Sequence, residues 1–128
     1  MRLRGAWGGL RGTGVRVTKA MVESLKVQFG LDGWTITVRK KRGSNGDALG
    51  ETVTQPRFKR ATITLYPDKI RAEKSVFPDE SQKKVLRHEF GEIWMSQFEV
   101  MLPDSVVESE AYIKFADAAA DELARIIL

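Results

Sequence analysis

The segment from Ser81 to Met101 constrains the fold more than any other part of the chain. An α-helix advances about 100° per residue, and apolar side chains would cover most of the circumference of a helix formed here. The remaining narrow stripe consists of Ser81, Val85, His88, Glu89, Glu92, Ser96 and Glu99. A helix of this type is mostly buried, and its polar stripe faces either water or a cleft. We therefore predict a long buried helix that is capped by Asp79 or Ser81 and ends near Met101.

Two more helices are predicted, one on each side of this segment in the chain. Apolar residues recur at helical spacing after Thr18, a good N-cap residue, and the pattern stops at Gly30. The same spacing runs from about residue 106 to 127. In this last helix the predicted buried face consists of Tyr112, Phe115, Ala116, Ala119, Leu123 and Ile126. The acidic residues of the opposite face, which we expect to point toward solvent, are Glu110, Asp117 and Asp121.

Two strands are predicted between the first and second helices. Apolar and polar residues alternate at 34–39 and again at 61–66, a pattern that is typical of half-buried strands. The glycine-rich stretch 42–56 has turn chemistry and predicts a long hairpin loop, and residues 68–78 are predicted to be a connection. The chain is therefore predicted to be α+β, with a small mixed or antiparallel sheet packed on three helices.

The composition limits the class of protein. The chain has 128 residues, of which 42% are hydrophobic and 30% charged, as in ordinary globular domains. The absence of cysteine excludes disulfides, cysteine zinc sites and a thiol nucleophile. Nothing has the pattern of a membrane span or a signal peptide, so we expect a cytoplasmic protein without a membrane partner. Residues 1–16, rich in Gly and Arg, are predicted to be a flexible basic arm before a single domain at 17–128.

The polar stripe of the central helix has the pattern of a metal site. His88 and Glu92 are four residues apart and therefore share one helix face. A metal ion needs ligands that converge on one point, and one helical turn supplies two of them, while the adjacent Glu89 can take a proton from water. His88 is the only histidine, so a site here must combine it with carboxylates and water. The alternative is a solvated helix face, with Lys84 and Arg87 close to the acids.

Glu108 is a candidate third ligand. It lies in line with the apolar face of the last predicted helix, in its first turn. Because burial of an unpaired carboxylate is costly, Glu108 should have a partner there. That partner is a metal ion, Arg87 or the N-terminus of its own helix.

These residues resemble the zincin metallopeptidases, in particular the small gluzincin-type domains of the ImmA/IrrE-like branch. The resemblance covers roughly residues 59 to 120. Its matching features are the strand Ala61–Tyr66, the segment Val85–Trp94, and Glu108 followed by Ala111 and Phe115–Ala116.

The resemblance implies that His88 is the first metal ligand, Glu89 the general base and Glu108 the third ligand. Glu92 stands at the second ligand position, where the family has histidine. A carboxylate there makes the site harder and more negative, so the metal implied is Zn²⁺ or another divalent ion such as Mn²⁺ or Fe²⁺.

The resemblance also implies where a peptide or protein substrate would bind. It puts the strand at 61–66 on the rim of the cleft, and an extended peptide would add beside that strand. Thr64 and Tyr66 would then be substrate-binding residues. Tyr66, Tyr112 or Arg87 would stabilise the oxyanion that forms when the carbonyl is attacked.

Three functions follow from these patterns. The first is a metal-dependent peptidase-like hydrolase. The second is a catalytically inactive zincin-fold binding or regulatory protein, such as a phage or mobile element would encode, and Glu92 is the reason to consider it. The third is a basic nucleic-acid-binding protein that uses the N-terminal arginines and the run Arg39–Arg42. The net charge of +4 fits this third function, but no recognised nucleic-acid motif accompanies it, so it is not favoured.

Overall fold

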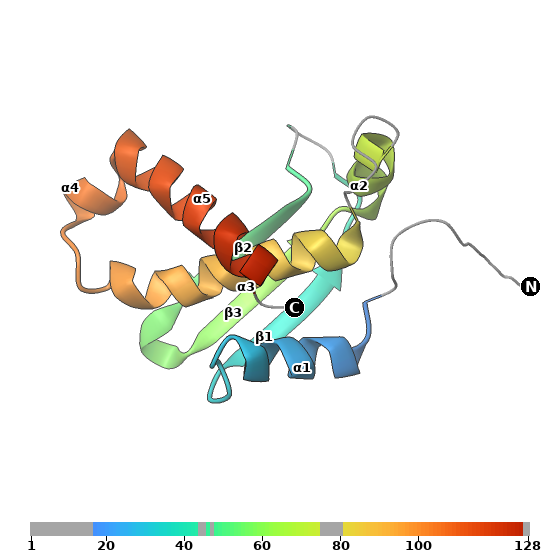
Figure 1. Cartoon of the computed structure of the whole chain (residues 1–128), viewed down its shortest axis with the longest axis horizontal. Helices are drawn as coiled ribbons and strands as arrows, with labels where there is room; N and C mark the ends of the chain where they lie inside the picture. The colour runs from blue at the N-terminus through green and yellow to red at the C-terminus, as the bar shows by residue number, and fades with distance from the viewer. Residues whose placement is uncertain (1–16, 44–45, 47, 75–80, 127–128) are drawn as a thin grey trace, which may run out of the picture.

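The computed structural model describes residues 17–43, 46, 48–74 and 81–126. The elements in these residues are α1 (Lys19–Gln28), β1 (Thr35–Lys40), β2 (Gly50–Gln55), the 3-10 turn η1 (Pro56–Phe58), β3 (Arg60–Leu65), α2 (Pro67–Lys74), α3 (Gln82–Glu99), α4 (Asp104–Val107) and α5 (Glu110–Ile126). Figure 1 shows a small sheet with α1 and α3 lying along it and α5 crossing α3. The predicted α+β class is confirmed, with a mixed sheet.

β3 is the central strand of the sheet. It pairs in parallel with β1, where Val38 lies opposite Ile63, and in antiparallel with β2, where Thr52 lies opposite Ile63. The side chains of Ala61, Ile63 and Leu65 are buried in the core. Both neighbouring strands are therefore edge strands, and β2 lies next to α3.

The prediction of one long hairpin loop over 42–56 is wrong, because β2 occupies its second half. The hairpin joins β2 to β3 through η1, and Lys59 completes the turn with a φ of 51°. β2 has no apolar alternation in its sequence, since its inward positions include Thr52 and Thr54 while Val53 is exposed. The sequence pattern for a half-buried strand was therefore absent.

The helix starts follow the predicted capping. The Thr18 hydroxyl accepts a hydrogen bond from the Met21 amide at 3.2 Å, and Ser81 caps α3 by accepting one from the Lys84 amide at 3.1 Å. The stretch predicted as a connection begins inside α2, which Ile70 anchors in the core. The candidate cap Asp79 and the end of that connection lie outside the described residues, as does the predicted basic arm at 1–16.

α5 packs on α3 through small residues, and this changes the predicted orientation of the helix. Ala116, Ala120 and Ala124 are its buried positions, whereas Phe115 and Ile126 are exposed. A Cβ added to Gly91 of α3 would lie only 2.7 Å from the Ala120 carbonyl oxygen and 2.9 Å from its Cα. The close contact between the two backbones favours alanine over larger apolar side chains at this interface.

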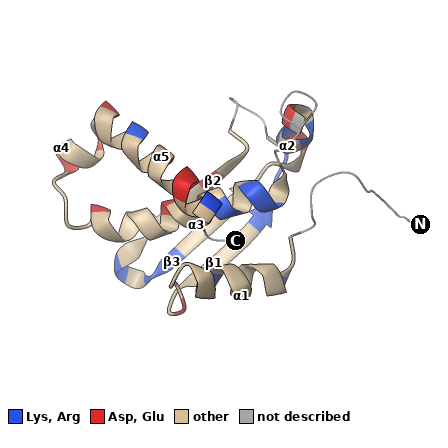
Figure 2. Ribbon diagram, in the orientation of Figure 1, with Lys and Arg blue, Asp and Glu red and all other residues tan. Residues whose placement is uncertain are grey.

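Charge is distributed unevenly over the fold. Figure 2 shows Lys and Arg on the first half of α3 and near the end of β1, whereas α4 and the start of α5 carry Asp and Glu. Within the described residues, no helix is long and apolar enough to cross a membrane.

Candidate metal centre

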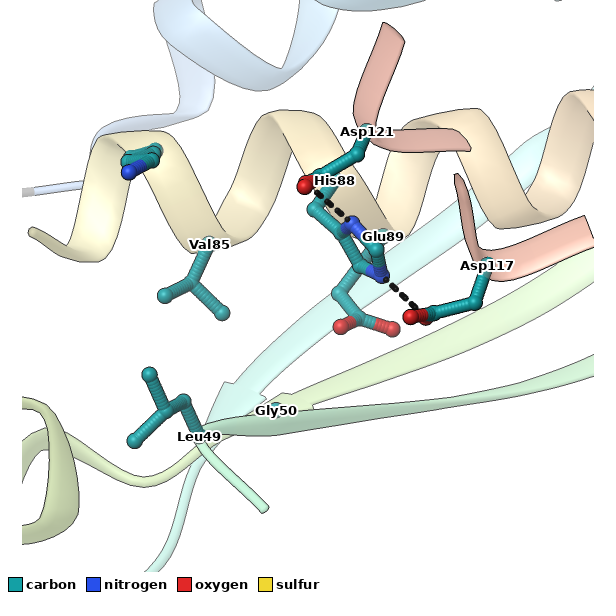
Figure 3. A pocket seen from close by; sticks show the side chains of 8 residues that line it. Leu49, Gly50, Val85, His88, Glu89, Asp117 and Asp121 are labelled. Carbon is teal, nitrogen blue, oxygen red and sulfur yellow. Dashed lines mark hydrogen bonds and ion pairs between the residues drawn. The ribbon is translucent and has the colours of Figure 1, made fainter. Parts of the chain in front are cut away.

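His88 is held between two carboxylates of α5. Its Nε2 atom lies 3.2 Å from Asp117 Oδ1, and its Nδ1 atom lies 2.9 Å from Asp121 Oδ1 (Figure 3). The two aspartates are four residues apart and therefore share one face of α5. Their side chains are 71% and 72% exposed, as expected for the solvent side, but they point at His88. The alanine contact with α3 turns this face of α5 toward the histidine.

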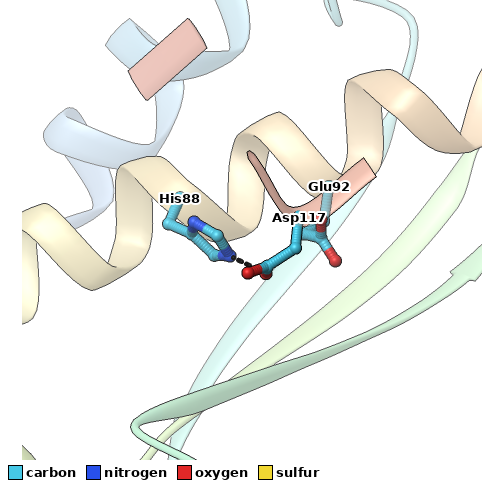
Figure 4. A group of neighbouring side chains, drawn as sticks. All are labelled: His88, Glu92 and Asp117. Atoms are coloured by element: carbon cyan, nitrogen blue, oxygen red, sulfur yellow. Dashed lines mark ion pairs between the residues drawn. The ribbon is translucent and has the colours of Figure 1, made fainter. Parts of the chain in front are cut away.

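Three side chains converge on one point between α3 and α5. One ligand atom each of His88, Glu92 and Asp117 lies within 4.8 Å of the others. Figure 4 shows the three side chains directed toward one another, two from α3 and one from α5. Two carboxylates and one imidazole form a donor set suited to a divalent ion such as Zn²⁺, Mn²⁺ or Fe²⁺.

Glu92 lacks a partner for one of its oxygens. Its Oε1 atom is buried and has no hydrogen bond. Burial raises the pKa of the Glu92 carboxyl to about 7, although the nearby His88 opposes this shift. A buried carboxylate oxygen without a partner favours a proton or a cation, so the environment of Glu92 fits a metal ligand.

Several carboxylates also act on the titration of His88. Burial alone would lower the pKa of this imidazole, but the hydrogen bond to Asp121 and the charges of Glu89, Glu92 and Asp117 together raise it. The carboxylates around His88 therefore favour positive charge at this point, either as a proton on the imidazole ring or as a cation beside it.

Glu89 is buried beside the edge strand β2. The Thr52 hydroxyl donates a hydrogen bond to Glu89 Oε1 at 2.5 Å. Burial raises the pKa of the Glu89 carboxyl, and the Thr52 hydrogen bond opposes that rise. A Cβ at Gly50 would lie 3.3 Å from Glu89 Oε2 and 2.9 Å from Val85 Cγ1, so a larger residue at this position would crowd both side chains. Neither Thr52 nor Gly50 was predicted, because both belong to the unpredicted strand.

A cavity of about 370 Å³ opens between β2 and α3 (Figure 3). Leu49, Gly50 and Val85 line one part of it, and His88, Glu89 and Asp117 line another. Two of the candidate ligands, His88 and Asp117, and the candidate base Glu89 therefore share a space into which a small group or a peptide segment could enter.

Glu108 does not belong to the group of converging ligands. It is the exposed C-cap of the short helix α4 and precedes α5. The acidic residue that α5 brings to His88 and Glu92 is Asp117. Asp117 and Asp121 are an i, i+4 pair in the sequence, but the predicted rotation of the helix turned both toward solvent.

Thr64 lies in the central strand and Tyr66 directly follows it, and neither lines the cavity. β3 has a partner on both sides, so the prediction that 61–66 forms the rim is wrong and a peptide cannot add to this strand. Thr64 is buried and its hydroxyl accepts a hydrogen bond from Arg39 Nε at 3.4 Å. The Tyr66 hydroxyl donates to Glu51 at 2.6 Å. The strand that borders the cavity is the edge strand β2, whose first residue, Gly50, lines it.

No family model, curated protein or solved structure matches this chain. The donor set of His88, Glu92 and Asp117, with Glu89 beside it, is therefore the basis for assigning a function.

Proposed function

We propose that this protein is a metal-dependent, peptidase-like hydrolase of the cytoplasm. In this proposal His88, Glu92 and Asp117 hold a divalent cation and Glu89 is the general base. The supporting observation is the convergence of three ligand atoms within 4.8 Å, together with a buried oxygen of Glu92 that has no hydrogen bond. Ligands of one ion lie about 2.0–2.2 Å from it, so small side-chain movements would suffice to surround a cation.

Each residue of the site has a distinct role in this proposal. A divalent cation would supply a Lewis acid that polarises a carbonyl group and makes water more acidic. Glu89 accepts a proton from water in the cavity, and burial raises the pKa of its carboxyl, which makes it a stronger base. Thr52 fixes the carboxylate of Glu89 through its hydrogen bond. Asp121 accepts from Nδ1 of His88, which leaves Nε2 directed toward Asp117 and Glu92.

The outer edge of β2 is the reason to propose a peptide or protein as the substrate. Its outer edge has no strand partner among the described residues, and the cavity lies beside it. An extended peptide can form main-chain hydrogen bonds with such an edge. Its carbonyl group would then approach Glu89 from the β2 side of the cavity.

Metal uptake and peptide cleavage test the proposal separately. Purified protein is treated with chelator, and binding of Zn²⁺ and Mn²⁺ is then measured by calorimetry. Glu92→Gln and Asp117→Asn should each weaken binding at least tenfold, whereas Glu89→Gln should bind metal and lose cleavage of a random peptide library, read by mass spectrometry. Wild-type protein that takes up neither ion would refute the proposal.

A non-catalytic binding protein is the second candidate. It is favoured by the ion pairs that His88 already makes with Asp117 and Asp121, because they satisfy the imidazole without a metal. If this candidate is right, the native protein binds no metal ion. Glu92→His, which produces the His-Glu-x-x-His pattern, should then create zinc binding. If Glu92→His binds zinc no more tightly than the native chain, this candidate is refuted.

A further inference from the structure

A second hollow, of about 290 Å³, lies between the first half of α3 and the end of α5. Lys84 and Arg87 line it from α3, and Asp121, Ala124 and Arg125 line it from α5. Figure 2 shows the basic turns of the two helices at this crossing. Three cationic side chains thus surround a hollow that has a single acid in its wall.

Arg87 has an unmet hydrogen-bonding group at this hollow. Its Nε atom is buried and donates no hydrogen bond. A buried donor without an acceptor costs free energy, and a guanidinium group matches the geometry of carboxylate and phosphate oxygens. Arg87 lines the hollow, so an oxyanion that its guanidinium group can reach would supply the missing acceptor.

Asp121 and Glu122 are acids close to the cationic side chains of the hollow. Asp121 is engaged with Nδ1 of His88. Arg125 pairs with Glu122, but both side chains are largely exposed, and such surface pairs contribute little and exchange easily. Arg125 can therefore turn toward an anion in the hollow at small cost.

We infer that this hollow, formed by Lys84, Arg87 and Arg125, binds an oxyanion, that is, a carboxylate or a phosphate group. Lys84 and Asp121 also line the cavity of the candidate metal centre, so the two sites share a wall. An anion in the hollow lies beside any ligand in that cavity. Binding of the anion itself requires neither a metal ion nor catalysis.

Nuclear magnetic resonance titration of the full chain tests this inference. Inorganic phosphate and N-acetylaspartate are added separately at constant ionic strength, which keeps charge screening equal. Saturable shifts should appear at backbone amides of residues 84–88 and 121–126. Loss of one charge-assisted hydrogen bond should weaken binding about tenfold in Arg87→Gln. Arg125→Gln, at an exposed position where the fold is not at risk, should also weaken it.

Lys114→Gln is the matched control, because Lys114 is an exposed cation on the same helix but does not line the hollow. Its affinity for both probes should equal that of the native chain. Tighter binding of phosphate would identify a phosphorylated ligand, and tighter binding of N-acetylaspartate an acidic one, and either supports the inference. The absence of saturable shifts with both probes, or unchanged affinity in both arginine variants, would overturn it. Metal uptake, measured on the same samples, reports separately on the proposed function.

Discussion

The Nδ1 atom of His88 lies 2.9 Å from the Oδ1 atom of Asp121. A carboxylate at this distance accepts the Nδ1 proton and fixes the ring with its Nε2 lone pair directed away. Nε2 is the atom that faces Asp117. Asp121 is therefore placed to orient His88 as a metal ligand without being a ligand itself.

We predict that Asp121→Ala weakens binding of Zn²⁺ or Mn²⁺ by about tenfold or more, the usual effect of losing a carboxylate behind a histidine ligand. Asp121→Asn should have a smaller effect, because its amide oxygen can still accept the Nδ1 proton. Calorimetric titration measures both. Glu122→Gln, at the next and exposed position of α5, is the control and should bind the metal ion as tightly as the native chain. Equal affinity in all three variants would show that Asp121 does not orient the histidine.

The metal-free protein should lose stability as the pH rises from about 4.5 to above 7. Glu89, Glu92 and His88 all have pKa values that are raised in the folded state. The folded protein therefore binds protons more tightly than the unfolded chain in this range, and stability falls as these protons leave. For Glu92, whose pKa rises from 4.5 to about 7, solvent screening reduces the loss to about 1–2 kcal/mol.

Thermal unfolding in the presence of chelator, at pH 5, 6, 7 and 8, measures this dependence. Glu92→Gln should flatten the curve, because the amide does not titrate. The low pKa of Asp68 acts in the opposite direction, but only as the pH falls below about 4, outside this window. A melting temperature that rises from pH 5 to pH 8 would contradict the prediction.

The central helix could be predicted from sequence because its pattern determines both its type and its burial. A long segment with one narrow polar stripe favours a mostly buried helix, and α3 spans Gln82–Glu99 with its cap at Ser81. The pairing of His88 with Glu92 follows from the same periodicity. β2 could not be predicted, since its inward side chains are threonines and a glycine, which carry no apolar alternation.

The third acidic residue could not be predicted, because it depends on the rotation of α5. Hydrophobicity favoured burial of Phe115 and Ile126, but both are exposed. The contact is decided by the space beside Gly91, into which Ala120 fits. The space available between α3 and α5 therefore outweighed the hydrophobic pattern of the α5 sequence in setting the rotation of this helix. As a result Asp117, and not the predicted Glu108, lies at the candidate centre.

Gly91→Val should destabilise the protein by about 1–3 kcal/mol, the usual cost of overpacking a tight contact. A Cβ at this position already lies 2.7 Å from a backbone atom of α5, so the helix must move away. That movement should also draw Asp117 and Asp121 away from His88 and weaken metal binding. Urea unfolding and calorimetry measure the two effects, with the exposed Ala118→Val as control. Native stability in Gly91→Val would mean that the helices are not in close contact.

Thr52→Val should destabilise the protein more at pH 8 than at pH 5. Valine has nearly the shape of threonine but cannot donate the hydrogen bond that Glu89 Oε1 accepts. At pH 8 a larger share of the buried carboxyl is charged than at pH 5, and loss of the donor to the charged form costs about 1–3 kcal/mol. At pH 5 the raised pKa of Glu89 keeps a larger share of the carboxyl protonated, and a neutral acid needs the donor less. Urea unfolding at both pH values measures the difference, and Thr37→Val, at an exposed strand position, should show little effect at either. An equal loss of stability at both pH values would mean that Thr52 contributes through packing and not by stabilising the charge of Glu89.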